Sequence, residues 1–332
     1  MKTPSLAVAI LLVARLAVAQ PLVSAVDAVG MTVSDMDRAV AFYTTVLDFA
    51  PLSDVEVAAE SYARLAGVTG ARVRIVRLRL GDEAIELVEY RTPRGRPLPP
   101  DSRSNDRWFQ HVAIVVSDMD RAYARLRQHR VEHASSAPQT LPAWNPQAAG
   151  IRAFYFKDPD AHVLELLQFP PDKGAAKWRA ASERLFLGID HTAIVVADTD
   201  ASLRFYRSAL GFAVAGESLN HGPEQEQLND VRGARLRITA LRGGAGPGIE
   251  LLEYLAPGGG RPIAPDQRAN DVGHWQTRLV AADAAKSAEV LRERGVAFVS
   301  PGVVDIPDDA LGFDLSLLVR DPDGHAVEVV QP

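Results

Sequence analysis

Four apolar segments of the chain have one equivalent position, and the residue at this position differs among them. Two of them, residues 109–116 and 188–196, are rich in Ile, Val and Ala and carry a histidine there. Imidazole is the most common metal ligand among side chains, so a histidine on a buried strand is a candidate ligand. The occupants of the shared position, in chain order, are Ala28, His111, His191 and Gln276.

A second set of residues could bind the same ion. A glutamate stands among aliphatic residues near the end of each repeat, and a buried carboxylate is costly unless it is paired or binds a metal. These residues are Glu86, Glu165, Glu250 and Glu328. A single histidine or glutamate on a strand usually has a packing or surface role, whereas the repetition favours metal binding. Imidazole with carboxylate suits Zn, Ni, Mn, Co or Fe(II), and the sequence does not distinguish among them.

The elements that must position these residues come from a duplication. Residues 27–90 match residues 190–254, and the motif at 158–162 recurs at 321–325 with nearly the same offset. Each half divides again, and each quarter predicts a strand, a helix and two or three further strands. The quarters are called modules 1 to 4 and comprise residues 26–90, 109–167, 188–254 and 275–330. The fold class is therefore α+β.

Helix start signals follow the first strand of each module. Asp35 and Asp118 suit the N-cap position, where a carboxylate accepts hydrogen bonds from free backbone N–H groups. Helices are expected from 118 to about 128 and from 284 to 294. Residues 171–187 predict a helical linker between the halves. The long segment 133–150, rich in Pro, Ser and Ala, is interpreted as a lid.

The sequence resembles the vicinal oxygen chelate superfamily in two motifs. One is the strand with a histidine followed by a helix that contains Phe205-Tyr206, and the other is the motif at residues 321–328 near the end of the module. This superfamily includes glyoxalase I, bleomycin-resistance proteins and extradiol dioxygenases. The resemblance implies four βαβββ modules in two glyoxalase-like domains, residues 24–170 and 188–332. It also implies one divalent metal ion, held by residues of the first and last strands of paired modules.

The pairing of the modules determines which candidate ligands lie in the same site. If modules 1 and 2 pair and modules 3 and 4 pair, one site contains His191, Glu250, Gln276 and Glu328. If modules 2 and 3 pair, the resemblance implies a site of His111, Glu165, His191 and Glu250. We favour the second arrangement because it collects the best ligands. The weaker candidates Glu86, Gln276 and Glu328 then belong to a degenerate site.

The resemblance implies isomerase or lyase chemistry of the glyoxalase I type on a small oxygenated metabolite. The metal acts as a Lewis acid, and Glu165 or Glu250 moves the proton. Two alternatives remain open, a protein that binds a small molecule as the drug-resistance members do and an extradiol-type dioxygenase. Substrate-facing candidates with weaker support are Tyr206, His221 and Trp275.

Composition limits the partners of the chain. The 332 residues carry a net charge of −6, which favours neither nucleic acid nor an anionic membrane as a partner. Residues 1–19 are a predicted signal peptide, because they contain Lys2, an apolar run after it and a small-residue cleavage site near Ala19. The mature protein is then periplasmic or extracellular, and glutathione-linked methylglyoxal chemistry fits that location poorly. A small-molecule substrate and a monomer or homodimer are expected.

Overall fold

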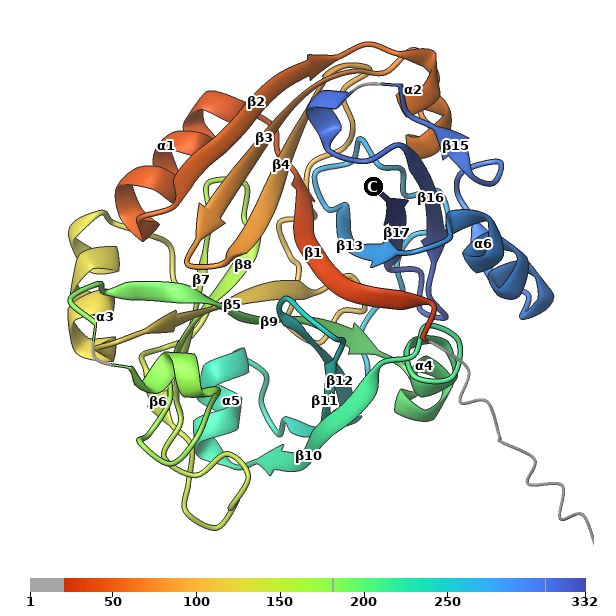
Figure 1. Cartoon of the computed structure of the whole chain (residues 1–332). Coiled ribbons are helices and arrows are strands. Elements are labelled where there is room, and N and C mark those ends of the chain that lie inside the picture. Colours follow the sequence, from red (N-terminus) through yellow and green to blue (C-terminus); the bar gives the residue numbers. More distant parts are fainter. Residues whose placement is uncertain (1–20, 181, 308) are drawn as a thin grey trace, which may run out of the picture.

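The computed structural model describes residues 21–180, 182–307 and 309–332, which form two curved β-sheets with helices packed around them (Figure 1). The predicted signal peptide, residues 1–19, lies outside the described residues. Among the residues that the structure describes, no helix has the length and apolar character needed to cross a bilayer.

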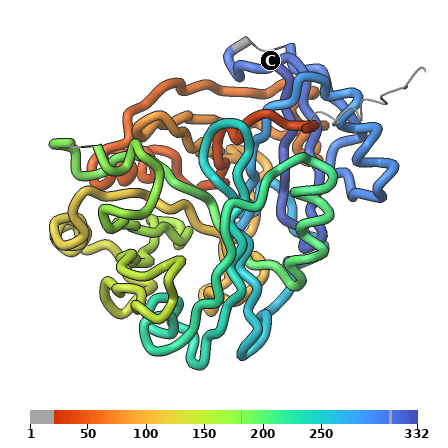
Figure 2. Tube along the Cα trace, turned by 60° about the horizontal axis from the view of Figure 1, so that its bottom comes forward, coloured from red at the N-terminus to blue at the C-terminus, as the bar shows by residue number. Residues whose placement is uncertain are grey.

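One sheet, called the outer-module sheet, combines modules 1 and 4. Its strands, in spatial order, are β14 (Ala297–Phe298), β16 (Leu315–Arg320), β17 (Ala326–Gln331), β13 (Trp275–Ala281), β1 (Val23–Thr32), β4 (Glu83–Thr92), β3 (Arg72–Leu80) and β2 (Ala50–Val57), with β15 (Val304–Asp305) beside β16. The first and last modules therefore lie side by side, as the red and blue parts of the chain show (Figure 1, Figure 2).

The other sheet, called the inner-module sheet, combines modules 2 and 3. Its strands, in spatial order, are β10 (Ala213–His221), β11 (Arg235–Arg242), β12 (Gly248–Ala256), β9 (Phe186–Val196), β5 (Gln110–Val116), β8 (Val163–Gln168), β7 (Arg152–Lys157) and β6 (Gln139–Thr140). Strands β5 and β9 pair antiparallel at its centre. This is the favoured module pairing. Each sequence half thus contributes one module to each sheet and does not form a sheet of its own.

The helices begin where the N-cap signals place them. Asp35, Asp118, Asp198 and Asp283 each accept backbone hydrogen bonds from the first turn of a helix. The helices are α1 (Met36–Leu47), α2 (Glu60–Ala66), α3 (Met119–Gln128), α4 (Thr199–Tyr206), α5 (Pro223–Asn229) and α6 (Ala284–Glu293), with 3-10 turns η1 (Ala176–Arg179) and η2 (Asp309–Leu311). The expected bounds of α3 and α6 agree with these to within one residue.

Two apolar clusters fill the space between the sheets and the helices. One packs α1 and α3 against β1, β4, β5 and β8, and the other packs α4 and α6 against β9, β12, β13 and β17. The opposite face of each sheet carries a smaller apolar cluster and is free to hold a site.

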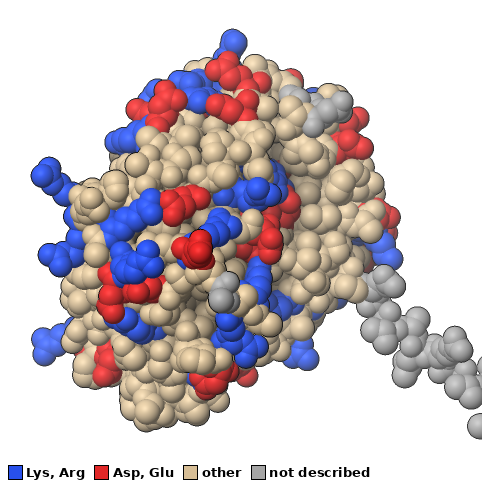
Figure 3. Space-filling view, turned by 60° about the vertical axis from the view of Figure 1, so that its left-hand side comes forward, with Lys and Arg blue, Asp and Glu red and all other residues tan. Residues whose placement is uncertain are grey.

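The described part of the linker between the halves consists mostly of turns and bends. Its helical part is limited to η1, so the expectation of a helical linker over 171–187 is too broad. The segment 133–150 contains the short strand β6 and packs on β10, where Asn145 donates a hydrogen bond to Asn220 at 2.7 Å. Figure 3 shows one face of the molecule, on which basic and acidic side chains are interspersed rather than gathered by sign.

Candidate metal centre

The strands of the inner-module sheet bring three predicted ligands together around Ala113. In the register of β5, Ala113 lies opposite His191 of β9 on one side and opposite Glu165 of β8 on the other. His111 is two residues before Ala113 and therefore points to the same face. The small side chain of Ala113 leaves the space between the three larger ones open.

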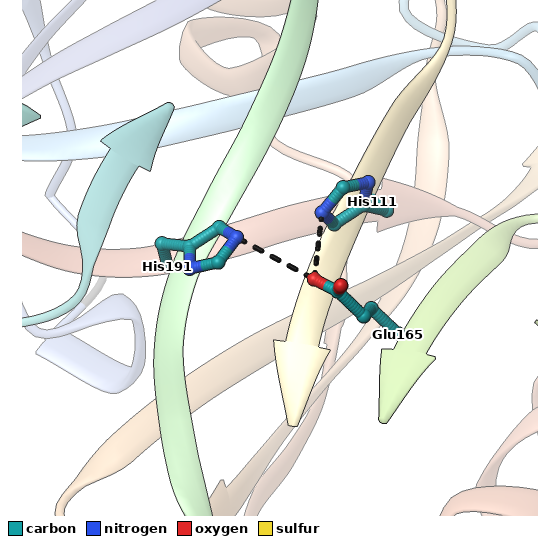
Figure 4. A group of neighbouring side chains, drawn as sticks. All are labelled: His111, Glu165 and His191. Atoms are coloured by element: carbon teal, nitrogen blue, oxygen red, sulfur yellow. Dashed lines mark ion pairs between the residues drawn. The ribbon is translucent and has the colours of Figure 1, made fainter. Parts of the chain in front are cut away.

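The ligand atoms converge on one point (Figure 4). Glu165 Oε2 lies 3.2 Å from His111 Nε2 and 3.5 Å from His191 Nε2. All three residues are buried, and their ligand atoms lie within 4.8 Å of one another. The fourth predicted ligand, Glu250 of β12, places Oε2 at 3.4 Å from His191 Nε2. The structure thus brings His111, Glu165, His191 and Glu250 into one cluster.

The hydrogen bonding of this cluster fits a cation. Although the distances are short, His111 Nδ1 and Nε2 and His191 Nε2 have no hydrogen-bond partner among the described residues. Buried polar atoms are almost always paired, so unpaired imidazole nitrogens beside a buried carboxylate fit the role of metal ligands. Two imidazoles and two carboxylates are a donor set suited to a divalent transition metal.

Electrostatics at the site favour positive charge. Burial alone would lower the pKa of His191, but the negative charges of Glu250, Asp190 and Glu165 raise its pKa to about 10. Burial would raise the pKa of Glu165, but its close contacts with the two histidines lower it to about 2. Without a metal, the proton that His191 holds supplies positive charge beside these carboxylates.

Asp190 holds the ring of His191. Its Oδ2 accepts a hydrogen bond from His191 Nδ1 at 3.0 Å and one from Arg242 Nη2 at 2.7 Å. Its Oδ1 accepts a third from Trp178 Nε1 in the linker at 2.9 Å. Burial opposes ionisation of Asp190, yet the contacts with His191 and Arg242 lower its pKa below the ordinary value. With Nδ1 donating, His191 turns Nε2 toward the cluster, as metal-binding histidines commonly do.

The cluster opens into a cavity of about 600 Å³. The lid segment supplies Leu141 and Gln147 to its wall, and the linker supplies Lys177 and Trp178. Glu83, the first residue of β4 in module 1, binds Lys177 and accepts a hydrogen bond from the backbone N–H of Ile189. Segments of module 1 and the linker therefore complete a site that is built on modules 2 and 3.

The corresponding position of the outer-module sheet is filled by an arginine. Arg278 occupies the place of Ala113, opposite Ala28 of β1 and Glu328 of β17. Its guanidinium donates two hydrogen bonds to Glu86, at 2.6 and 2.7 Å, and one to Glu328, at 2.7 Å. An arginine side chain therefore lies among the three weaker candidate ligands. Glu86 and Glu328 bind an internal cation, Gln276 donates to Glu328, and we place no metal there.

The weaker substrate-facing candidates lie elsewhere. Tyr206 is buried in the core and donates a hydrogen bond to Asp321, and Trp275 packs edge-on against His162. His221 is exposed at the end of β10 and stacks on Trp144 of the lid, with ring centroids 4.2 Å apart. None of the three predicted residues lines the cavity at the cluster.

Sequence reasoning missed the residues that support the cluster. Asp190 directly precedes His191 and could have been identified as its partner, since a carboxylate commonly orients a metal-binding histidine. Arg278 lies two residues after Gln276, where module 2 has Ala113, and that difference signals a changed site. Trp178 and Arg242 carry no comparable signal, because only the folded chain brings them to Asp190.

Paired βαβββ modules with a histidine and glutamate cluster on one sheet define a glyoxalase-like protein of four modules. A family model of the Glyoxalase/Bleomycin resistance protein/Dioxygenase superfamily matches residues 25–166 and again residues 188–329. The chain belongs to this superfamily, as its motifs led us to expect.

Individual relatives agree with this assignment. The chain is 35% identical to a 2-epi-5-epi-valiolone epimerase of an Actinomyces species over 150 residues. The matched region covers 44% of this chain and 80% of the relative. Among solved structures it resembles glyoxalase I from Zea mays, with a TM-score of 0.62 and 18% identity over 93% of this chain and 92% of that one. It also resembles a putative dioxygenase from Bacillus subtilis, with a TM-score of 0.58 and 13% identity over 94% and 86% of the two chains. At these identities the two structures support the fold.

Proposed function

We propose that this protein is a metal-dependent isomerase or epimerase that moves a proton beside a carbonyl group of a small oxygenated metabolite. The observation that carries the proposal is the convergence of His111, Glu165, His191 and Glu250 at the floor of a cavity. The relative named as an epimerase and the fold shared with glyoxalase I support the same class of chemistry.

These four residues would hold a divalent cation, which would supply Lewis acidity toward the oxygen of a carbonyl group. The protein supplies the base. Glu165 is buried between His111 and His191, which leaves its carboxylate little access to a substrate. Glu250 keeps 24% of its side chain exposed, on the cavity side. We therefore assign the proton transfer to Glu250 and a fixed ligand role to Glu165.

The test follows the proton directly. The metal-loaded protein is incubated in deuterated water with 2-epi-5-epi-valiolone, the compound in the name of the relative, and with simple α-hydroxy ketones. We expect deuterium to enter the carbon beside the carbonyl, and Glu250→Gln to abolish the exchange. The matched control is Glu253→Gln, because Glu253 stands three residues later on β12 and contacts the N-terminus of α4 instead. Exchange that survives Glu250→Gln would contradict the assignment.

A second candidate function is supported by the ligand set itself. His111, His191 and Glu165 alone make the combination of two histidines and one carboxylate that is typical of non-haem Fe(II) oxygenases. Glu250, at 3.4 Å from His191 Nε2, takes up space that such enzymes leave open for oxygen. Oxygen uptake by the Fe(II)-loaded protein with a catechol would favour the dioxygenase. Ligand binding without either reaction would favour a binding protein.

We also propose that residues 1–19 direct export. Their support is the basic residue, apolar run and small-residue site described above. Expression with these residues in a bacterium, followed by fractionation and N-terminal sequencing, should recover a periplasmic chain that begins near Gln20. A full-length chain in the cytoplasm would contradict the proposal.

A further inference from the structure

We infer that the cavity accepts a neutral, hydroxyl-rich ketone and excludes substrates that carry a phosphate or carboxylate group. The inference rests on the proposed function for the ketone, but its evidence is separate. It comes from the ion pairs, the charge balance and the hydrogen-bonding groups of the cavity wall.

Both cationic side chains of the wall are already neutralised. Lys177 of the linker is bound by the buried carboxylate of Glu83, which comes from module 1. Arg242 of β11 donates from Nη2 to Asp190 at 2.7 Å and from Nη1 to the backbone carbonyl of the same residue at 2.6 Å. An anionic group entering the cavity would have to compete with carboxylates that are already in place.

The charge balance of the wall offers no excess positive charge, even with a metal. Of the five carboxylates that line the cavity, Glu217 is paired with Arg237 of β11 at 3.1 Å. The other four, Glu83, Glu165, Asp190 and Glu250, are balanced by Lys177, Arg242 and a divalent cation. In a cavity of low dielectric constant, a phosphate or carboxylate would enter without a free cation to neutralise it, which is unfavourable.

A chain of side-chain amides makes one wall polar without charge. Asn145 of the lid donates to Asn220 at 2.7 Å, Asn220 donates to Gln225 at 3.0 Å, and Gln225 donates to Asn229. Asn229 in turn donates to the hydroxyl of Tyr254 at 2.7 Å. These bonds fix the orientation of each amide group in the chain.

The fixed amides match hydroxyl groups. Asn220 and Gln225 both line the cavity and are more than nine-tenths buried. Each uses one N–H and one carbonyl lone pair in the chain, which leaves a second N–H and a second lone pair. A hydroxyl can donate to one and accept from the other, whereas a phosphate or carboxylate can only accept. Several hydroxyl groups on a small ketone are therefore the complementary ligand.

The test compares a neutral ketone with its charged counterpart. The probes are D-xylulose and its terminal phosphate ester, added to metal-loaded protein in a calorimeter. We expect the neutral ketone to bind at least tenfold more tightly. Equal or tighter binding of the phosphate ester to the wild-type protein would overturn the inference.

Two variants locate the cause. Gln225→Leu should weaken binding of the neutral ketone by about five- to tenfold, the effect of one lost hydrogen bond. Gln227→Leu, on the exposed side of the same helix α5, should leave it unchanged. Glu83→Gln releases Lys177 and should tighten binding of the phosphate ester. If Glu83→Gln changes the affinities for the neutral ketone and the phosphate ester by the same factor, the wall charges do not select the ligand and the inference is wrong.

The outcomes separate this inference from the proposed reaction. Selective binding of the neutral ketone without deuterium exchange would reject the reaction and keep the substrate class. Exchange confined to phosphorylated or carboxylated ketones would keep the reaction and reject the substrate class.

Discussion

Replacing Asp190 by Asn should weaken metal binding without unfolding the protein. The carboxylate of Asp190 accepts from three donors, His191 Nδ1, Arg242 Nη2 and Trp178 Nε1. Asparagine has one oxygen where aspartate has two, so its NH₂ group must face at least one of these donors. If the oxygen stays with His191, the contact to Trp178 is lost, and if the group flips, His191 loses its acceptor.

The size of the effect follows from the bond that is lost. A hydrogen bond to a charged group contributes about 1.5–3 kcal/mol, and a tenfold change in affinity corresponds to about 1.4 kcal/mol. We therefore expect Asp190→Asn to raise the dissociation constant of the metal by about 10- to 100-fold, in the range that such supporting residues usually show.

The assay is titration of metal-free protein with Co(II), followed by its visible absorption. The spectrum reports the ligand geometry, so a changed band shape would show that the ring of His191 has moved. The matched control is Asp27→Asn, since Asp27 holds the same place in module 1, where it binds Arg77. Asp190→Asn with wild-type affinity and spectrum would refute the role assigned to Asp190.

Two further predictions concern residues outside the cluster. Arg278→Ala leaves Glu86 and Glu328 buried without their cation and should lower the free energy of unfolding by about 3–5 kcal/mol in urea, with metal content unchanged; a loss below about 1 kcal/mol would contradict the bridging role. Buried His162 lies between Asp158 and a backbone carbonyl, both acceptors, so the ring is doubly protonated and its pKa is raised above the ordinary value although burial opposes this. A raised pKa stabilises the fold below about pH 6.5, and this contribution is lost as the pH rises through the folded value. The stability gap between wild type and His162→Gln should therefore be wider at about pH 6 than at about pH 9, and a gap independent of pH would show a neutral ring.

Local patterns in the sequence predicted the elements because those patterns depend on near neighbours. The N-caps at Asp35 and Asp118 correspond to the starts of α1 and α3. The linker was the exception. Its alanines favour a helix, but only the short 3-10 turn η1 forms, and Trp178 in that turn donates a hydrogen bond to Asp190.

The candidate site was predictable in part for the same reason. Repetition identified His111 and His191 as a pair, but spacing alone allowed either module pairing, because partner choice depends on contacts between distant segments. The consequence of Arg278 also required the register of β13 against β1, which places its guanidinium between two glutamates. The wall residues Glu83 and Lys177 come from module 1 and the linker, and no local pattern connects them to modules 2 and 3.

Counting metal ions per chain tests the site most directly. The protein is freed of metal with a chelator, loaded by dialysis against Zn, Mn, Co or Ni, and analysed by mass spectrometry for metal content. We predict about one ion per chain for the wild type and for Gln276→Ala, and less than a tenth of an ion for His111→Ala/His191→Ala. Two ions per chain, or an equal content in the wild type and the double variant, would contradict a single metal centre on the inner-module sheet.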